Sequence, residues 1–131
     1  MLPALSLAVV GAAYPNKGKS PARRFEIALC VPGELVDLRP EPENPADEYA
    51  VAVYSQRDVQ LGYLTAERAP WIGKLIRGGR EVRAIFQEQS GFGGVIRVAF
   101  DGEMPALPTS NPAPPPAPPD DFWPDPVWED N

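Results

Sequence analysis

Hydrophobic and polar residues alternate in short runs along the first hundred residues, and turn-forming pairs such as Pro32-Gly33 and Gly93-Gly94 separate several of the runs. Alternation with a period of two places successive side chains on opposite faces of an extended chain, which is typical of a β-strand. The pattern predicts up to seven short strands, at residues 5–11, 25–31, 34–39, 50–54, 60–64, 81–87 and 95–100.

One stretch departs from this alternation and is typical of a helix. Residues 66–77 follow Thr65, a favourable N-cap residue, and they contain Pro70, which fits either the first helical turn or a kink between two short helices. Gly78 and Gly79 then end the run. We therefore expect one or two short helices between the last strands.

Short strands around a single helical region favour a mainly β fold. A small barrel of six to seven strands, similar to OB or SH3 barrels, is the expected form because closure of a sheet removes its exposed edges. Barrels of this class include many oligonucleotide binders, although a fold alone does not establish a function.

The last 29 residues differ in composition from those before them. Ten of the 18 prolines lie after Gly102, and residues 108–119 contain only Pro, Ala, Thr, Ser and Asn. Such a segment favours extended conformations and cannot bury a core. We expect a barrel domain at residues 1–102 and a disordered, acidic tail at residues 103–131. Three large aromatic residues lie among carboxylates at its tip: Phe122, Trp123 and Trp128. Such a tip is suited to binding a partner protein, to folding back on the cations of the domain, or simply to keeping the chain soluble.

Charge is distributed unevenly along the chain. The formal net charge is −6, yet residues 1–102 carry 12 Lys and Arg against 12 Asp and Glu, so all six excess acids lie in the tail. Contact with a phosphate backbone requires clustered cations. The domain has two such clusters: Lys17, Lys19, Arg23 and Arg24, and Arg68, Lys74, Arg77, Arg80 and Arg83.

The chain contains no histidine and a single cysteine, Cys30. It therefore lacks the ligand sets that hold structural zinc, and it cannot form an internal disulfide. We expect no catalytic residues, no metal and no cofactor, and we expect Cys30 to be a small buried hydrophobic residue. The apolar start of the chain lacks a basic segment and ends at Gly11, so we expect a cytoplasmic protein that does not bind membranes.

The most specific stretch runs from Leu38 to Tyr54 and includes Glu-Pro-Glu-Asn-Pro-Ala-Asp-Glu-Tyr-Ala-Val-Ala-Val; Leu61-Gly-Tyr-Leu64 follows it. Over residues 9–100 the chain resembles the HIRAN family. The family pattern is a strand, a proline-rich acidic loop that contains Asn-Pro-x-Asp, a second strand and then Gly-Tyr-Leu. The resemblance implies a barrel related to OB folds that grips the 3′ end of single-stranded DNA and is fused to DNA-remodelling helicases. We expect no helicase motor here, because residues 91–94 lack the Lys-Ser/Thr of a phosphate-binding loop and read as a hairpin turn.

The resemblance also implies which side chains contact DNA. Asn44 and Asp47 match the family motif, in which the aspartate accepts a hydrogen bond from a terminal 3′-hydroxyl. Arg24 and Phe25 occupy the position of a basic and an aromatic residue, suited to a phosphate and a base.

Two positions differ from the DNA-end-binding members of the family. Ala46 replaces a stacking tyrosine, and Tyr63-Leu-Thr-Ala66 replaces a segment with a histidine and a lysine. We expect Tyr63 to stack on a base in their place, and Arg68 and Lys74 to supply positive charge from the helix.

Several of these side chains also have purely structural interpretations. Asn44 and Asp47 are common turn residues, and Asp47 is as well suited to holding its loop as to contacting a ligand. Phe25 and Tyr63 are equally suited to packing in the barrel, as is Trp71 on the helix.

Three classes of function remain open. We predict a monomeric, non-enzymatic nucleic-acid-binding module that recognises single-stranded DNA or a 3′ DNA end in repair or replication, alongside a separate helicase or nuclease. The alternative is a protein-interaction adaptor that recruits a DNA repair or helicase partner through the barrel or the tail. A carboxylate-based phosphodiesterase, with magnesium held by acids between residues 41 and 48, is the third.

Overall fold

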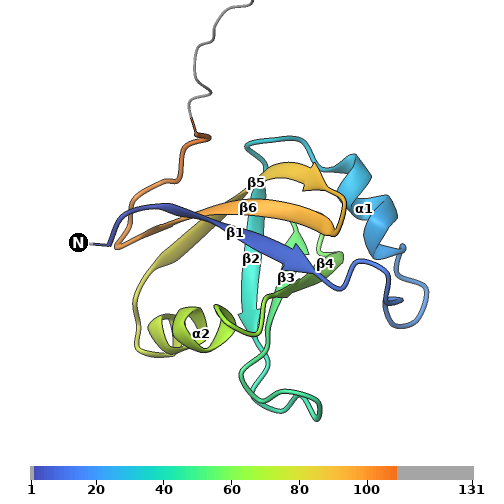
Figure 1. The fold of residues 1–131 in the computed structure, drawn as a ribbon, viewed down its shortest axis with the longest axis horizontal. Helices are drawn as coiled ribbons and strands as arrows, with labels where there is room; N and C mark the ends of the chain where they lie inside the picture. The colour runs from blue at the N-terminus through green and yellow to red at the C-terminus, as the bar shows by residue number, and fades with distance from the viewer. Residues whose placement is uncertain (1, 109–131) are drawn as a thin grey trace, which may run out of the picture.

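The computed structural model describes residues 2–108, which form six strands and two short helices (Figure 1). In chain order the elements are β1 (Leu5–Val10), α1 (Arg23–Leu29), β2 (Leu35–Pro40), β3 (Val51–Ser55), β4 (Gln60–Leu64), α2 (Ala69–Arg77), β5 (Val82–Ser90) and β6 (Gly93–Phe100). No helix in this part of the chain is long and apolar enough to cross a membrane. The predicted tail, from residue 103 onward, lies mostly outside the described residues.

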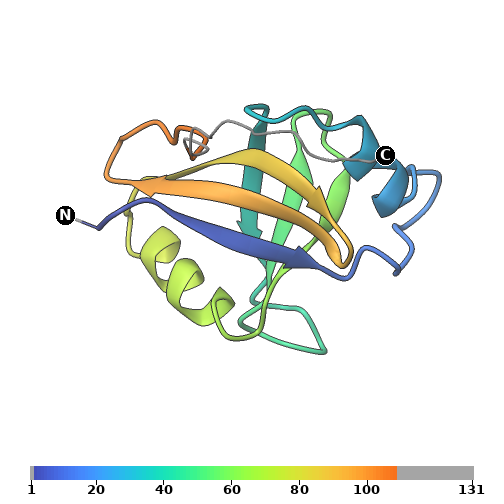
Figure 2. The ribbon, with the colours of Figure 1, turned by 45° about the horizontal axis from the view of Figure 1, so that its top comes forward.

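The six strands form a closed antiparallel barrel in the order β1-β4-β3-β2-β5-β6, and β6 pairs with β1 to complete it. Figures 1 and 2 show β1, β5 and β6 as one layer that crosses steeply over β2, β3 and β4. The barrel interior is apolar, with Val51, Val53, Leu61, Ile96 and Val98 completely or almost completely buried. The mainly β barrel predicted from the alternation is confirmed.

The barrel closes between β1 and β4 through a short contact that only glycine allows. Val9 pairs with Leu64 and Val10 pairs with Tyr63. A Cβ atom on Gly62, which has φ of +155°, would lie 2.2 Å from the carbonyl oxygen of Val10. Glycine at this position therefore lets β4 approach β1, where Tyr63 pairs with Val10.

The strand predicted at residues 25–31 is wrong, because residues 25–29 belong to α1. Its buried side chains are Arg23, Glu26 and Ile27, followed by the partly buried Cys30. Spacings of three and four residues are those of one helix face, so the segment buries a stripe rather than alternate residues. Cys30 packs against the core as expected for a small hydrophobic residue, and burial raises the pKa of its thiol to about 11.

The helix predicted at residues 66–77 is present as α2 but begins later than expected, at Ala69. Thr65 does not cap it: its carbonyl accepts hydrogen bonds from the backbone N–H groups of Arg68 and Ala69, which form a turn before α2. Pro70 lies in the first turn, and the helix ends at Gly78 as predicted. Trp71 packs on Phe100 with 5.8 Å between ring centroids, so it joins the core.

The turn expected at Gly93-Gly94 lies two residues earlier, at Gly91 and Phe92. Both glycines 93 and 94 belong to β6, where a Cβ on Gly93 would lie 2.5 Å from the carbonyl oxygen of Val9. Gly93 is therefore required by the approach of β6 to β1 rather than by the hairpin turn.

A buried carboxylate attaches α1 to the barrel. Glu26 is 2% exposed, and its Oε2 accepts hydrogen bonds from Ser55 Oγ at 2.7 Å and from Arg57 Nε at 2.6 Å. Arg57 also donates to both carboxylate oxygens of Glu34. Burial of a charge is costly unless it is paired and hydrogen-bonded, so these contacts are what permit Glu26 to face inward.

Replacement of this carboxylate tests its role in holding α1. Glu26→Ala leaves the buried Ser55 hydroxyl without its partner, and we expect the free energy of unfolding to fall by about 2 kcal/mol in urea denaturation. Glu67→Ala, which removes an exposed carboxylate, is the matched control and should change stability little. Equal effects of the two substitutions would show that Glu26 does not anchor the helix.

Candidate nucleic-acid interface

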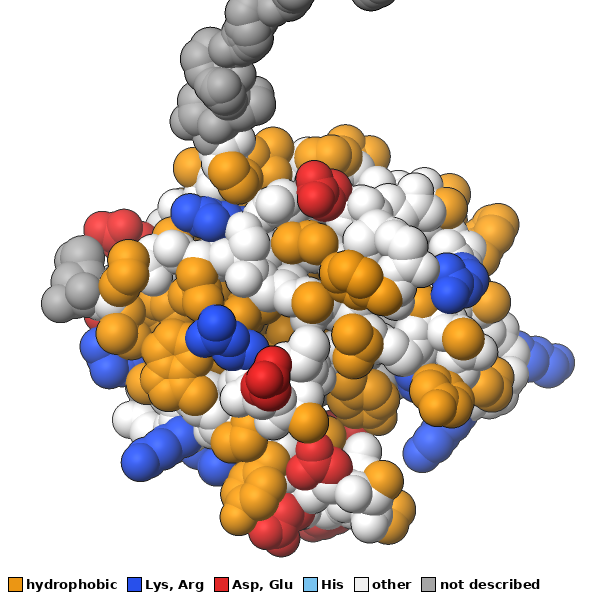
Figure 3. Space-filling model, viewed as in Figure 1, with side chains coloured by type: hydrophobic (Ala, Val, Ile, Leu, Met, Phe, Trp, Pro, Cys, Tyr) orange, Lys and Arg blue, Asp and Glu red, His pale blue; other side chains and the backbone are white. Residues whose placement is uncertain are grey.

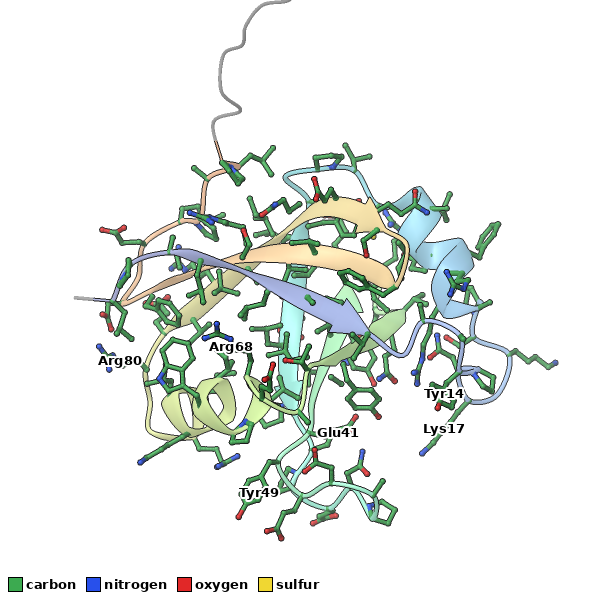
Figure 4. The ribbon with its side chains drawn as sticks, in the orientation of Figure 1. Tyr14, Lys17, Glu41, Tyr49, Arg68 and Arg80 are labelled. Atoms are coloured by element: carbon green, nitrogen blue, oxygen red, sulfur yellow. The ribbon has the colours of Figure 1, made fainter. Side chains whose placement is uncertain are left out.

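A groove of about 880 Å³ runs over the outer surface of the barrel beside the β1–β4 contact. One wall is the loop between β1 and α1, and the other is the loop between β2 and β3. In Figure 4, Lys17 and Glu41 lie on these two loops. The groove is lined by Pro15, Asn16, Lys17, Ser20, Arg23, Glu41, Pro42, Glu43, Asn44, Pro45, Tyr54, Asp58, Gln60 and Tyr63.

The wall before α1 is held in place by a buried arginine. Arg23 is 7% exposed; its Nε donates to Asn16 Oδ1 at 2.7 Å and its Nη1 donates to the carbonyl oxygen of Gly11 at 3.0 Å. Asn16 in turn donates through Nδ2 to the carbonyl oxygens of Pro21 and Gln60. The loop is therefore bonded both to α1 and to β4, which places Arg23 at the groove.

Arg23 has no ion pair with any carboxylate among residues 2–108. Its guanidinium lies over the ring of Tyr63, with Cζ 5.5 Å from the ring centroid. An arginine carries five N–H donors, and the described contacts use one each from Nε and Nη1. Within residues 2–108, the direct contacts of this buried cation are therefore with carbonyl oxygens and an aromatic ring.

The opposite wall is shaped by Asn44 and Asp47, the two residues of the Asn-Pro-x-Asp motif. Asn44 Oδ1 accepts hydrogen bonds from the backbone N–H groups of Ala46 at 2.8 Å and Asp47 at 3.2 Å. Asp47 Oδ1 accepts from the N–H of Tyr49 at 2.9 Å. Both side chains therefore hold the loop in its turn conformation, which is one of the two roles expected for Asp47.

Tyr63 connects the two walls. Its hydroxyl donates to Glu41 Oε1 at 2.9 Å, and Asn44 Nδ2 donates to the same oxygen at 3.0 Å. The ring, half-buried on β4, faces the groove between Arg23 and Glu41. Because two donors satisfy one Glu41 oxygen, this carboxylate is held in a defined position beside the tyrosine.

A second arginine lies over an aromatic ring on the same side of the barrel. Arg39 is 3.8 Å from the ring centroid of Tyr54, and it forms ion pairs with Asp37 and Asp58. Tyr54 and Asp58 both line the groove. The groove therefore offers guanidinium and aromatic surfaces together, with carboxylates at its edge.

The structure brings together only part of the predicted site. Asn44 and Tyr63 line the groove, and Asp47 follows it closely in the same loop. Arg24 and Phe25 lie on the exposed face of α1, and Phe25 is 59% exposed. Figure 4 places Arg68 at the other side of the molecule, near α2, where Lys74 is also exposed. The predicted partner residues lie outside the described part of the chain: Phe122, Trp123 and Trp128.

Arg23 lies at the groove, whereas the sequence favours its neighbour Arg24 as the contact residue and gives Arg23 only as part of a basic cluster. The expectation of a strand caused the difference, because it placed no weight on the spacing of Arg23, Glu26 and Ile27. That spacing is the helical signal that identifies Arg23 as inward-facing. Asn16, Tyr54 and Gln60 carry no motif, and only the fold brings them to the groove.

Within the described residues, the cations fall into two kinds. Four of them form ion pairs with carboxylates: Arg39, Arg57, Arg80 and Arg83. The remaining eight form none: Lys17, Lys19, Arg23, Arg24, Arg68, Lys74, Arg77 and Arg97. The cations without carboxylate partners include every basic residue that precedes or begins α1, so this side of the groove carries a positive charge that internal pairing does not cancel.

Carboxylates are also numerous on the loop between β2 and β3. Among the residues that the structure describes, however, no group of three or more His, Cys, Asp or Glu side chains is arranged to hold a metal ion. Of the three acids that line the groove, Glu41 bonds to Tyr63 and Asn44 and Asp58 pairs with Arg39, while the side chain of Glu43 has no such contact among the described residues.

Comparison with known proteins supports one family. The HIRAN domain model matches residues 4–90. The HIRAN domain of human HLTF has a TM-score of 0.58 at 21% identity, with 74% of each chain covered. A protein from Lactobacillus plantarum has a TM-score of 0.62 at 20% identity, with 72% of this chain and 90% of that chain covered. At these identities the two structures show a shared fold, and no curated protein matches the chain.

Proposed function

The chain belongs to the HIRAN family, whose domains are known generally as DNA-binding modules, and on this basis we propose that its groove binds single-stranded DNA or the 3′ end of a DNA strand. The observation that carries the proposal is Arg23, a buried cation at the groove without a carboxylate partner in residues 2–108. A phosphate is the ligand that would complete its contacts, because its oxygens match the parallel N–H donors of a guanidinium.

Other groups along the groove suit the remaining parts of a nucleotide. Lys17 lies on the same wall as Arg23 and would neutralise a neighbouring phosphate. Tyr63 and Tyr54 offer ring edges and faces beside the guanidinium groups of Arg23 and Arg39. Bases stack on aromatic rings and on guanidinium planes with little sequence preference, so we infer a tolerance of base identity.

Asp47 is the proposed acceptor for a terminal 3′-hydroxyl. One of its carboxylate oxygens accepts the N–H of Tyr49, and the other has no hydrogen-bond partner in the described structure. Asp47 follows the groove-lining residues Asn44 and Pro45 in the same loop, and we propose that this oxygen meets the end of a strand that lies in the groove. An internal nucleotide lacks the hydroxyl and cannot make this contact.

The exposed cations of the α2 region, Arg68 and Lys74, are proposed contacts for phosphates beyond the groove. We propose that the domain supplies recognition and no chemistry, as expected for a HIRAN domain by itself. A separate helicase or nuclease would then act on the bound strand during repair or replication.

The contribution of Asp47 is measured by fluorescence anisotropy with a short oligo-dT that ends in either a 3′-hydroxyl or a 3′-phosphate. We expect the full chain to bind the hydroxyl form at least about tenfold more tightly, because a charged acceptor strengthens the hydrogen bond. Asp47→Asn keeps an oxygen for the N–H of Tyr49 and should lose most of this preference. Equal binding of both oligonucleotides by the unmodified chain would contradict end recognition.

The phosphate contact is tested by the salt dependence of binding. Lys17→Met removes a groove cation that makes no hydrogen bond or ion pair within the described residues, so it should not disturb the fold. We expect it to reduce the slope of log K against log salt by about 0.7, the value for one phosphate contact on a single strand. Arg83→Met removes the same charge at a site paired with Glu81 and outside the groove. Identical slopes for the two variants would place the phosphates elsewhere.

A further inference from the structure

The outward face of α1 is apolar to an unusual degree for an exposed helix. Phe25 and Leu29 are 59% and 47% exposed, and they lie four residues apart, so they are neighbours on one face. Ala28 is exposed between them and continues this face. Large apolar side chains grouped on a helix surface mark a docking site more often than isolated ones do.

Cations lie on the same helix and in the loop before it. Arg24 lies on the same exposed side of α1, and Lys17 and Lys19 lie in the loop that leads to it. None of the three pairs with a carboxylate in residues 2–108, and the chain has no acid before Glu26, which is buried. Figure 3 shows orange and blue side chains next to one another on this side of the molecule. We call these residues the α1 surface: Lys17, Lys19, Arg24, Phe25, Ala28 and Leu29.

We propose that the α1 surface binds the C-terminal end of the same chain, residues 120–131. This segment contains no cation and carries the two features that complement the α1 surface, namely large aromatic side chains and dense negative charge. Its aromatic residues are Phe122, Trp123 and Trp128, and its acids are Asp120, Asp121, Asp125, Glu129 and Asp130. Aromatic side chains supply most of the buried area in such contacts, and complementary charge directs their approach.

The length of the intervening chain permits the contact. Eleven residues, 109–119, separate the last described residue from Asp120. At 3.1 Å per residue in an extended proline-rich segment they span about 34 Å, which is comparable to the diameter of a domain of this size. Tethering gives the segment an effective concentration on the order of millimolar, so a contact of modest intrinsic affinity is populated within one molecule.

The contact would regulate access to the groove. Lys17 belongs to both the α1 surface and the groove wall, so carboxylates bound at the α1 surface reduce the positive field that a phosphate would meet. The aromatic side chains of the chain end bind the α1 surface, so they hold its carboxylates beside the groove, where the carboxylates compete with a phosphate. Binding of DNA and binding of the chain end are therefore mutually unfavourable.

The test uses NMR on the full chain and needs no DNA, so its outcome is independent of the proposed function. Phe25→Ser/Leu29→Ser changes only exposed side chains of the α1 surface, and the indole N–H signals of Trp123 and Trp128 report the chain end, with Trp71 as an internal reference. We expect both tail indole signals to move toward random-coil positions in this variant while Trp71 stays in place. The converse variant, Phe122→Ser/Trp123→Ser/Trp128→Ser, should shift backbone amides of residues 17–31.

A matched control changes three spacer residues instead, Pro114→Ser/Pro115→Ser/Pro116→Ser, and should leave the amides of residues 17–31 unmoved. Tail indole signals that ignore Phe25→Ser/Leu29→Ser would overturn the proposal, as would amide shifts that map to α2. Shifts that disappear on dilution would assign the contact to two copies of the chain and also contradict it. In a separate measurement, loss of the tip aromatics should tighten oligo-dT binding about fivefold, as expected when a tethered competitor occupies about 80% of molecules.

Discussion

The approach of β4 to β1 is the contact on which the site depends. Because Gly62 has no side chain, β4 can pass within van der Waals distance of the Val10 carbonyl, and the barrel closes there. Closure places Tyr63 directly beside the end of β1, where the chain enters the loop before α1. Arg23 then bonds back to Gly11 at that end of β1. The groove therefore forms because the barrel closes between β1 and β4 and because the loop before α1 is hydrogen-bonded to that contact.

Hydrogen bonds between polar side chains in the groove fix both the backbone of the loop between β2 and β3 and the positions of the charged groups. Asn44 bonds its own loop through its carbonyl and Glu41 through its amide, so one residue both bends the backbone and fixes a carboxylate. Glu41 in turn orients Tyr63. On the opposite wall the positive charge of Arg23 is left without an ionic partner in the described structure. The groove thus presents a cation, Arg23, beside an oriented aromatic ring, Tyr63. We propose that a nucleotide, which has an anionic part and a planar aromatic part, contacts both.

Much of this fold could be predicted from the sequence, because all six strands and the end of α2 follow local patterns of alternation and glycine placement that tertiary packing reinforces. The helix α1 could not be predicted, because its seven residues fit a period of two as well as a helical period. Two of its buried residues, Arg23 and Glu26, are also charged, so hydrophobicity does not identify its inward face. Asn44 and Tyr63 were predicted because they belong to a motif with fixed spacing. Arg23 is not predicted as a contact residue, because its segment also fits a strand and because the partners that bury it meet it only in the folded barrel.

Amide chemical shifts, followed during titration of the ¹⁵N-labelled full chain with a short oligo-dT, would map the surface that binds DNA. We expect the largest shifts in the loop before α1, in residues 41–47 and at Tyr63, together with the Nε–H signal of Arg23. Shifts confined to α2, or none at low salt, would contradict the claim that this groove is the nucleic-acid interface.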